Sequence, residues 1–389
     1  MEAVHISPFI GYVYPNETIV PWTLLIVVYP YLTGLVAGAF TVSSLYHVFG
    51  MERFRPVSHL ALLTALSCMV VVPLALLLHL GHPERAFNAM ITPHTTSAFA
   101  IFGYAASFYV ILLMLENWFV FRPHIVRQAQ TAKGALGTFY RVLSLGSNDL
   151  SDNAMRYDRK WIFALAVIGI PAAHGLHGYV GFVFGSLKAR ELWSSDLMPA
   201  IFLFSAIISG TALLIVIYVL TCRFRKVPID LACLKGMAYA LWGFTMFTLV
   251  LEAVEFMSLI YRAREGTEII VEFLLGPLLV PLILQFGVGS AIPLIVLTLL
   301  FVSGAGGRTL VVSVFVSAWL VLLSVLMMRY NVVIGGQEIA KTGHGLIAYI
   351  PPLLGREGLL ASGVVLFLPF VLLAIVVRFF PPWRTAQPH

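Results

Sequence analysis

Charged residues are scarce in this sequence. Only 11% of its 389 residues are Asp, Glu, Lys or Arg, whereas 60% are hydrophobic. A soluble domain has about 25% charged residues, and a soluble fold of this composition would expose large apolar patches. The sequence instead contains repeated apolar stretches of about 20 residues, the length that crosses a bilayer. It therefore predicts an integral membrane protein.

Cysteine is scarce as well. The three cysteines, Cys68, Cys222 and Cys233, form no CxxC motif and no cluster with histidine. Iron–sulfur clusters and structural zinc sites need several such ligands close together. We therefore expect this chain alone to hold no iron–sulfur cluster and no metal site, and to have no disulfide framework.

The apolar stretches define the predicted fold class, an all-α integral membrane protein. Helices are expected because lipid offers no hydrogen-bond partner to an open strand edge. The region after residue 270 is one long apolar stretch, in which we expect a turn between Gly287 and Pro293. We predict a single transmembrane domain, 1–389, of about ten helices near 21–48, 57–80, 95–121, 160–184, 197–222, 235–260, 270–286, 288–305, 309–330 and 359–380.

Lysine and arginine are concentrated in alternate loops. Sixteen of them lie in the loops after the first, third, fifth, seventh and ninth predicted spans, and eight in the remaining segments. Cytoplasmic loops carry the excess of these residues. We therefore expect a multi-pass protein of the cell (cytoplasmic) membrane, with both termini outside and residues 122–160 as the main cytoplasmic loop. This topology also accounts for the net charge of +6, so no nucleic acid partner is expected.

Histidine and tyrosine gather near the predicted outer side. His174 and His177 are three residues apart and share a helix face, close to Tyr179. Ionisable groups at membrane depth are candidates for function. Tyr29, in the first predicted span, is a further candidate.

Two further outer segments have simpler interpretations. The segment from His82 to Arg85 follows the second span, and by itself it favours a turn with a local ion pair. Gly34 and Gly38 form a GxxxG pair, which predicts close helix packing.

Two carboxylates, Glu252 and Glu255, lie three residues apart within the sixth predicted span. A buried carboxylate is costly unless it is paired or protonated. Either they handle protons, or they form a structural salt bridge between helices, with Arg262 or Arg308 as the partner.

A quinone would suit this set of residues. Its headgroup needs hydrogen-bonding groups for two oxygens, together with groups such as histidine, tyrosine or carboxylate that exchange protons near neutral pH. Its tail needs an apolar cleft between helices. A haem b held by two facing histidines, His79 with His177, is an alternative that we place below the quinone.

Several short motifs occur in a recognisable order. They are YPYLTGLVAG at 29–38, LGHPER at 80–85, HGYVGF at 177–182, Leu192-Trp193 with Pro199, the small-residue segment 205–210, RYNVV at 329–333, and Tyr349-Ile350-Pro351 with Glu357. With these motifs the chain resembles the NrfD/PsrC family of polysulfide reductase membrane subunits. It is most similar to the longer, ten-helix HybB/DsrP-like branch, and within it to DsrP of the sulfite-reduction-associated DsrMKJOP complex.

The resemblance implies a subunit without haem or iron–sulfur cluster that binds menaquinone or ubiquinone near the outer face. It also implies a partner subunit with ferredoxin-like iron–sulfur clusters on that face. In DsrP-like systems the further partners are a cytochrome c, a haem b membrane subunit and a cytoplasmic iron–sulfur subunit. The expected function is electron exchange between menaquinol/menaquinone and the iron–sulfur partner, linked to sulfur or sulfite metabolism.

The resemblance also implies roles for particular residues. Tyr29 stands where the polysulfide reductase subunit has a quinone-contacting histidine, so a hydrogen bond is retained but proton exchange there is in doubt. His82 and Arg85 match the motif after the second span, and we expect them to shape the site rim or the docking surface. His177 matches the family histidine of the fourth helix. We expect His177 and Tyr29 to hydrogen-bond the quinone headgroup, and Tyr179 to belong to the same quinone-binding set. The alternatives from other classes are a secondary transporter and a purely structural membrane anchor.

Overall fold

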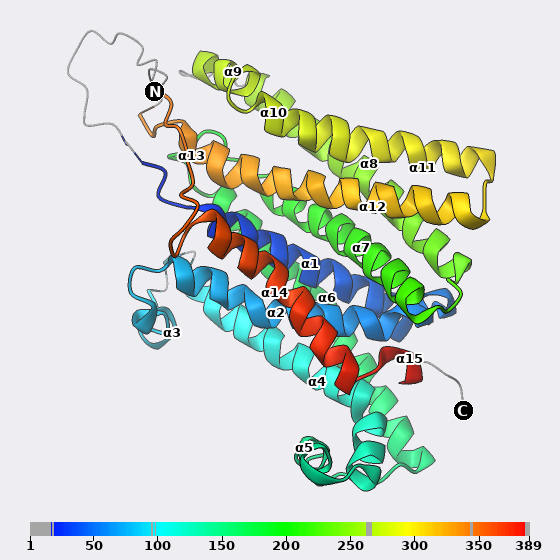
Figure 1. The fold of residues 1–389 in the computed structure, drawn as a ribbon. Helices are drawn as coiled ribbons and strands as arrows, with labels where there is room; N and C mark the ends of the chain where they lie inside the picture. Colours follow the sequence, from blue (N-terminus) through cyan, green and yellow to red (C-terminus); the bar gives the residue numbers. More distant parts are fainter. Residues whose placement is uncertain are drawn as a thin grey trace.

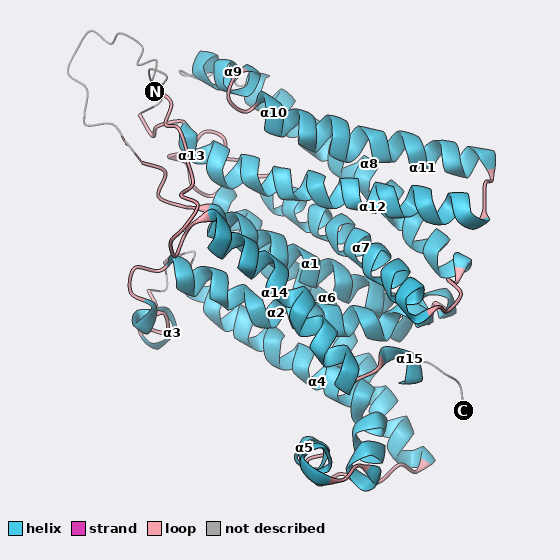
Figure 2. Ribbon diagram, in the orientation of Figure 1, coloured by secondary structure: helices cyan, strands magenta, loops and turns pink. Residues whose placement is uncertain are grey.

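The computed structural model describes residues 17, 19–94, 96–97, 99–261, 267–342 and 345–385. Within them the fold is all-helical and contains no strand, apart from one isolated bridge between Ile339 and Leu346 (Figure 2). The long helices are α1 (Leu24–His47), α2 (Arg55–His79), α4 (Ala100–Thr131), α6 (Asp152–Gly185), α7 (Met198–Arg225), α8 (Leu231–Tyr261), α11 (Ile292–Ser303), α12 (Gly307–Tyr330) and α14 (Leu359–Phe379).

Short elements connect the long helices. They are η1 (Glu52–Phe54), η2 (Pro83–Arg85), α3 (Asn88–Ile91), α5 (Gly134–Leu143), α9 (Thr267–Leu275), α10 (Leu279–Leu282), the π-helical segments η3 (Ile283–Ala291) and η4 (Asn331–Gly335), α13 (Gly336–Glu338) and α15 (Pro382–Thr385).

Nine helices of the described residues are long and apolar enough to cross a membrane. The expected division of residues 270–305 into two spans was wrong, because Leu279–Ser303 forms one continuous span. The backbone stays helical through Gly287 by switching to π-helical pairing, in which the amide of Ile292 donates to the carbonyl of Gly287. Pro293 then takes a place in the first turn of α11, where it needs no amide partner.

The two ends of the described chain lie at opposite ends of the bundle (Figure 1). We call them the Trp22 end, where Trp22 bonds to Gln337, and the α5 end, where the Tyr140 hydroxyl of α5 donates to the carbonyl of Phe379 at 2.7 Å. The expectation that both termini face one side required an even number of spans. With nine spans, residues 17 and 385 lie at opposite ends.

Helix α1 is the central helix of the bundle. In its most apolar window 89% of the residues are buried, and it packs against α2, α6, α7, α12 and α14. The closest approach is between Gly38 of α1 and Gly210 of α7, where a Cβ atom on Gly38 would lie 2.1 Å from the carbonyl oxygen of Ala206. The packing predicted for the glycine pair of this helix is therefore confirmed.

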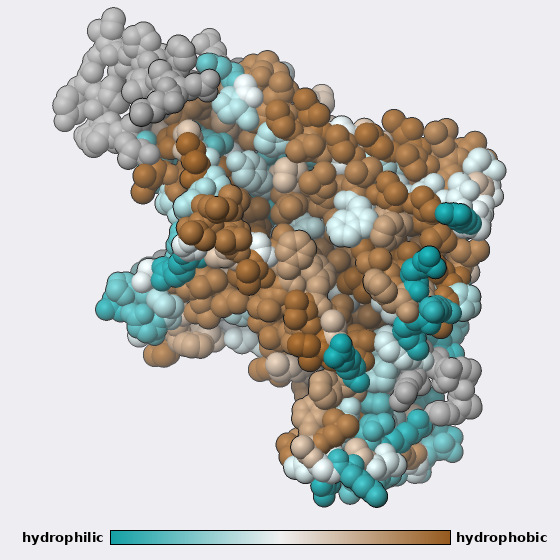
Figure 3. All heavy atoms as spheres, in the orientation of Figure 1, coloured by the Kyte–Doolittle hydropathy of each residue, from teal (hydrophilic) through white to brown (hydrophobic). Residues whose placement is uncertain are grey.

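The predicted cytoplasmic segment 122–160 contains the last turns of α4, helix α5 and the first turns of α6. Arg122 of α4 holds it together, with its Nη2 atom 2.6 Å from a carboxylate oxygen of Asp158 in α6. Apolar side chains cover the middle of the molecule, and hydrophilic residues gather near α5 and α3 (Figure 3).

Candidate functional site

A buried arginine, Arg329, lies in the last turn of α12 and has no exposed surface. Its Nη2 atom donates to His177 Nε2 of α6 at 3.1 Å and to Ser205 Oγ of α7 at 2.6 Å. The guanidinium carbon stands 3.8 Å from the ring centre of Phe202. A charged side chain within membrane depth is expensive and normally has a function, and this one is held by three helices.

The partners of His177 define its tautomer. Thr33 of α1 donates its hydroxyl proton to the carbonyl of Pro30 at 3.2 Å, so its oxygen accepts from His177 Nδ1, also at 3.2 Å. The other ring nitrogen, Nε2, accepts from Arg329. His177 is therefore neutral with its proton on Nδ1, and both ring nitrogens are engaged within the protein.

A second polar group lies beside the first, where the two π-helical segments face each other. Gln285 of η3 donates to the Glu252 carboxylate of α8 at 3.0 Å and accepts from Asn331 of η4 at 2.7 Å. The carbonyl of Gln285 also accepts from Ser324 at 2.9 Å. The side-chain oxygen of Asn331 has no hydrogen-bond partner within the described residues. π-helical segments are rare and often occur at functional sites.

These residues open into a cavity of about 80 Å³ that we call the Glu252 cavity. Four of its lining residues, Glu252, Glu255, Gln285 and Asn331, supply carboxylate and amide groups. The remaining lining residues are apolar: Leu192, Met198, Ile201, Phe256, Leu259, Leu274, Leu278, Leu282, Met328 and Val332. An apolar cavity with a few converging polar groups is typical of a small-molecule site.

The two polar groups are connected. Arg329 and Glu252 are close enough to interact electrostatically. A much smaller cavity, of about 10 Å³, is lined by Glu252 and by Ser205, the hydroxyl partner of Arg329. Further hydroxyl residues, Thr245, Thr248, Ser290 and Ser324, line the same space. His177, Arg329 and Glu252 thus belong to one buried polar region at the Trp22 end of the bundle.

The sequence-predicted carboxylates are both in this region. Glu255 accepts a hydrogen bond of 2.5 Å from Ser195 in the α6–α7 connection. Of the arginines considered as salt-bridge partners, Arg308 lies in the first turn of α12, toward the α5 end, and Arg262 lies outside the described residues. The arginine that interacts electrostatically with Glu252 is Arg329 instead.

The predicted tyrosines lie away from the Glu252 cavity. Tyr29 is buried and packs edge-on against Phe102 of α4, with ring centres 5.7 Å apart. Tyr179 is half-buried and contacts Phe182 on its own helix, with ring centres 5.6 Å apart. The structure therefore brings His177, Glu252 and Glu255 into one region, but neither tyrosine lines the cavity with them.

The segment from His82 to Arg85 is exposed at the Trp22 end, where His82 pairs with Glu84 at 2.9 Å. This is the local ion pair that its sequence favoured. His79, the other histidine of the haem alternative, lies 3.5 Å from Glu357, whereas His177 bonds to Thr33 and Arg329. The two histidines thus have separate partners. In the described part of the chain no group of three or more His, Cys, Asp or Glu side chains is placed to hold a metal ion.

Sequence reasoning missed Arg329, Gln285 and Asn331. Arg329 ends an apolar stretch, and the loop count assigned it to the connection after the ninth predicted span. The sequence feature that could have identified Arg329 is its position within one helical turn of that apolar stretch. The amides Gln285 and Asn331 are neutral, so the search for ionisable groups passed over them.

A comparison with known protein families identifies the family of this chain. The family "Polysulphide reductase, NrfD" matches residues 14–340. The chain belongs to the NrfD family. Its fold is accordingly that of an NrfD-type multi-pass membrane protein.

Three relatives of the NrfD-family chain differ in the reductase that they are named for. It is 38% identical over 205 residues to a selenate reductase subunit of Mesobacillus selenatarsenatis, covering 51% of the chain and 47% of the relative. It is 30% identical over 280 residues to a putative dimethyl sulfoxide reductase membrane subunit of Halobacterium salinarum, covering 71% and 61%. It is 25% identical over 236 residues to the Hdr-like menaquinol oxidoreductase integral membrane subunit of Archaeoglobus fulgidus, covering 61% and 51%. The chain thus spans about half to three fifths of the length of these relatives.

Proposed function

We propose that this NrfD-family chain is the quinone-reacting membrane subunit of a respiratory electron-transfer complex. It exchanges electrons between menaquinol/menaquinone and an iron–sulfur partner subunit. The observation that carries this proposal is the Glu252 cavity, where two carboxylates and the unpartnered oxygen of Asn331 meet an apolar lining beside a buried arginine.

The polar lining suits the headgroup of a quinol. Oxidation of a quinol to a quinone releases two electrons and two protons. In our proposal Glu252 and Glu255 accept the two protons, and the electrons pass to the iron–sulfur partner. The side-chain oxygen of Asn331 is placed to accept a hydrogen bond from a quinol hydroxyl. Carboxylates within hydrogen-bond reach of the reacting oxygens are the groups that such a proton transfer needs.

The apolar lining suits an isoprenoid tail. Leu274 and Leu278, from α9 and the turn before α10, and Leu282 of α10 line one side of the cavity, and Phe256 and Leu259 of α8 line another. These residues contribute little surface that water can hydrate, so a tail lying between α8 and α10 would bury apolar area.

In this proposal His177 does not line the Glu252 cavity and acts through its hydrogen bond with Arg329. The sequence led us to expect a hydrogen bond from His177 to the headgroup, but Arg329 and Thr33 occupy its two ring nitrogens. In this proposal His177 therefore stabilises the charge network instead of binding the headgroup. The small hydroxyl-lined cavity next to Glu252 has the size of about one water, and in this proposal its hydroxyl groups begin a polar route inward for protons. Tyr29 and Tyr179 support the helices around this network.

The orientation of the chain follows from a count over nine spans. Among the described residues, sixteen lysines and arginines occupy connections and flanks at the α5 end, five occupy those at the Trp22 end, and Arg329 lies inside the bundle. By the positive-inside rule we propose that the α5 end is cytoplasmic. The Glu252 cavity then lies near the outer face of the cell membrane, and the described chain ends in the cytoplasm at residue 385.

The partners form the last part of the proposal. An iron–sulfur subunit of the ferredoxin type docks at the outer face, where His82 and Arg85 are exposed. The relatives are named for selenate, dimethyl sulfoxide and menaquinol reactions. Sulfur or sulfite metabolism, with the cytochrome c, haem b and cytoplasmic iron–sulfur partners of the DsrP-like branch, is our proposal for this chain.

A binding titration tests the site. Purified protein is titrated with a fluorescent hydroxyquinoline N-oxide, a mimic of the quinol headgroup, with and without excess menaquinone. We expect saturable quenching that menaquinone competes away. In Glu255→Gln the affinity should fall about tenfold, since a hydrogen bond to a charged group contributes about 1.5–3 kcal/mol.

The matched control is Glu84→Gln, which removes the same charge from an exposed turn at the same end of the bundle. It should bind as the wild type does. Equal affinities in wild type, Glu255→Gln and Glu84→Gln would place the inhibitor elsewhere and overturn this site. Absence of any competable quenching in folded protein, assembled with its partners, would favour the structural anchor.

A further inference from the structure

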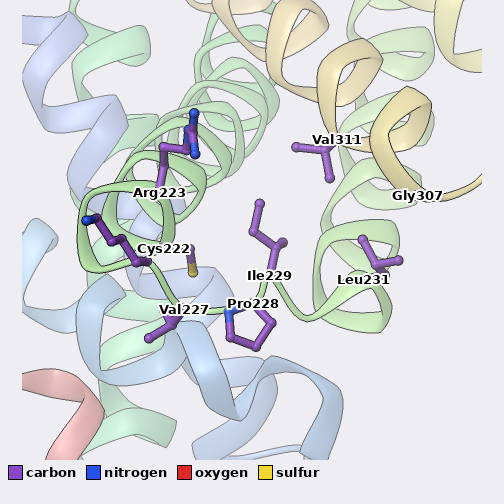
Figure 4. A pocket seen from close by; sticks show the side chains of 9 residues that line it. Cys222, Arg223, Val227, Pro228, Ile229, Leu231, Gly307 and Val311 are labelled. Carbon is purple, nitrogen blue, oxygen red and sulfur yellow. The ribbon is translucent and has the colours of Figure 1, made fainter.

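A second large cavity lies at the α5 end, far from the Glu252 cavity. It is formed where the end of α7 turns into α8 and meets the first turns of α12 (Figure 4). Its volume is about 540 Å³, and it opens to the surface of the molecule. Arg223 of α7 and Val311 of α12 face the same space from opposite walls. Nothing in the proposed quinone chemistry uses it.

The charged residues that line this cavity are all basic. Arg223 and Lys226 line it, and no carboxylate does. Neither side chain has an ion pair or hydrogen bond within the described residues. The acidic residue of the same turn, Asp230, is occupied, because its carboxylate accepts from the amides of Ala232 and Cys233 and so caps α8. The two cations are therefore available to an external anion.

Arg225, the third basic residue at the end of α7, has a different contact. Arg225 lies with its guanidinium carbon 3.7 Å from the ring centre of Trp383 and lines a separate cavity on the other side of the turn. Its charge is thus partly engaged by an aromatic ring. This leaves Arg223 and Lys226 as the pair that defines the first cavity.

The backbone at Lys226 is a further observation. Lys226 ends α7 in the left-handed conformation, with φ of 55°, and its amide bonds back to the carbonyls of Cys222 and Arg223. Glycine or asparagine normally occupies such a position, because other side chains are strained there. This conformation turns the chain sharply after α7, so that Lys226 and the residues after it line the cavity.

The walls of the cavity are apolar. Val227, Ile229 and Leu231 line it on the side of the turn, and Val311 lines it on α12. Next to it, Phe224 is 81% exposed, as expected for a side chain that faces lipid. A cationic mouth above an apolar wall, at the edge of the membrane-spanning region, matches a phosphate group joined to an acyl chain.

We propose that this cavity binds an anionic phospholipid of the cytoplasmic leaflet. Arg223 and Lys226 hold the phosphate, and one acyl chain lies along Leu231 and Val311. The lipid lies between the α7–α8 turn and the first turns of α12. The proposal is independent of the quinone site.

Native mass spectrometry of the detergent-purified protein tests the proposal. The protein is titrated with phosphatidylglycerol and, separately, with phosphatidylcholine carrying the same acyl chains. We expect tighter binding of phosphatidylglycerol. In Arg223→Gln/Lys226→Gln its affinity should fall about tenfold or more, since each basic residue near the surface contributes about 1 kcal/mol.

The control is Arg159→Gln/Lys160→Gln, which removes two exposed charges at the same end of the bundle, away from the cavity. It should retain the wild-type preference. Equal binding of the two lipids, or equal loss in both double variants, would overturn the proposal. A third arm adds inorganic phosphate at millimolar concentration. Displacement of phosphatidylglycerol by phosphate would show a free-anion site and overturn the lipid assignment.

Discussion

Arg329 Nη2 and His177 Nε2 are 3.1 Å apart, and the direction of the hydrogen bond makes the arginine the donor and the histidine a neutral acceptor. The pair joins α12 to α6 across the centre of the bundle, and Ser205 of α7 binds the same nitrogen. A planar guanidinium is needed to contact both partners and the face of Phe202 at once. The planar shape of the Arg329 guanidinium, and not its charge alone, therefore organises the site.

The first prediction concerns this geometry. Arg329→Lys keeps a positive charge but lacks the fork, so it should lower quinol oxidation by the intact complex at least tenfold, equivalent to about 1.4 kcal/mol. Steady-state turnover with a soluble quinol measures it. Arg356→Lys, at an exposed arginine of the Trp22 end, should be neutral. Wild-type turnover in Arg329→Lys, with the protein fully assembled, would contradict a role for the fork.

The second prediction concerns the crossing of α1 and α7. Gly38→Ala places a methyl group 2.1 Å from the carbonyl oxygen of Ala206, so the helices must separate. Overpacking of this kind costs about 1–3 kcal/mol, and we expect a lower melting temperature in a thermal unfolding assay. Gly363→Ala in α14 meets no atom within 4 Å and should not destabilise. Equal melting of the two variants would show that the crossing adjusts freely.

The third prediction concerns acid. At the Trp22 end, Glu17 lies between Arg190, at 3.1 Å, and Lys341, at 2.9 Å. Burial raises the pKa of this carboxyl, but the hydrogen bond from Lys341 and the charge of Arg190 outweigh it, so its pKa lies below the ordinary value of 4.5. A lowered pKa contributes stability above pH 4.5 that is lost as the pH falls through the folded-state pKa.

Thermal unfolding at pH 7 and at pH 3.5 measures this contribution. The difference in melting temperature between the two pH values should be smaller in Glu17→Gln than in the wild type. Glu52→Gln, at an exposed glutamate of the α5 end, should leave the difference unchanged. An identical pH response in Glu17→Gln and wild type would show that this ion pair adds no stability.

Much of the fold was predictable, because a spanning helix is defined by its own apolar residues. The prediction failed where backbone pairing decided the outcome. Gly287 and Pro293 look like a turn, but π-helical pairing carries the helix through them. That single difference changed the number of spans and moved residue 385 to the opposite end from residue 17.

The candidate site was predictable in part. His177 and Glu252 stand out because ionisable groups are costly in lipid. Gln285 and Asn331 do not, since a neutral amide within an apolar stretch shows its purpose only when its partner is known. Their hydrogen bond joins segments that are distant in the sequence, so no local sequence pattern predicts it.

The central position of α1 has a consequence for biosynthesis. Helix α1 is enclosed by helices that follow it in the chain, with 89% of its most apolar window buried in the finished bundle. Its neighbours α7, α12 and α14 are synthesised after it. During assembly the later helices therefore pack around α1. The site beside His177 is complete only after α12, which carries Arg329, has joined the bundle.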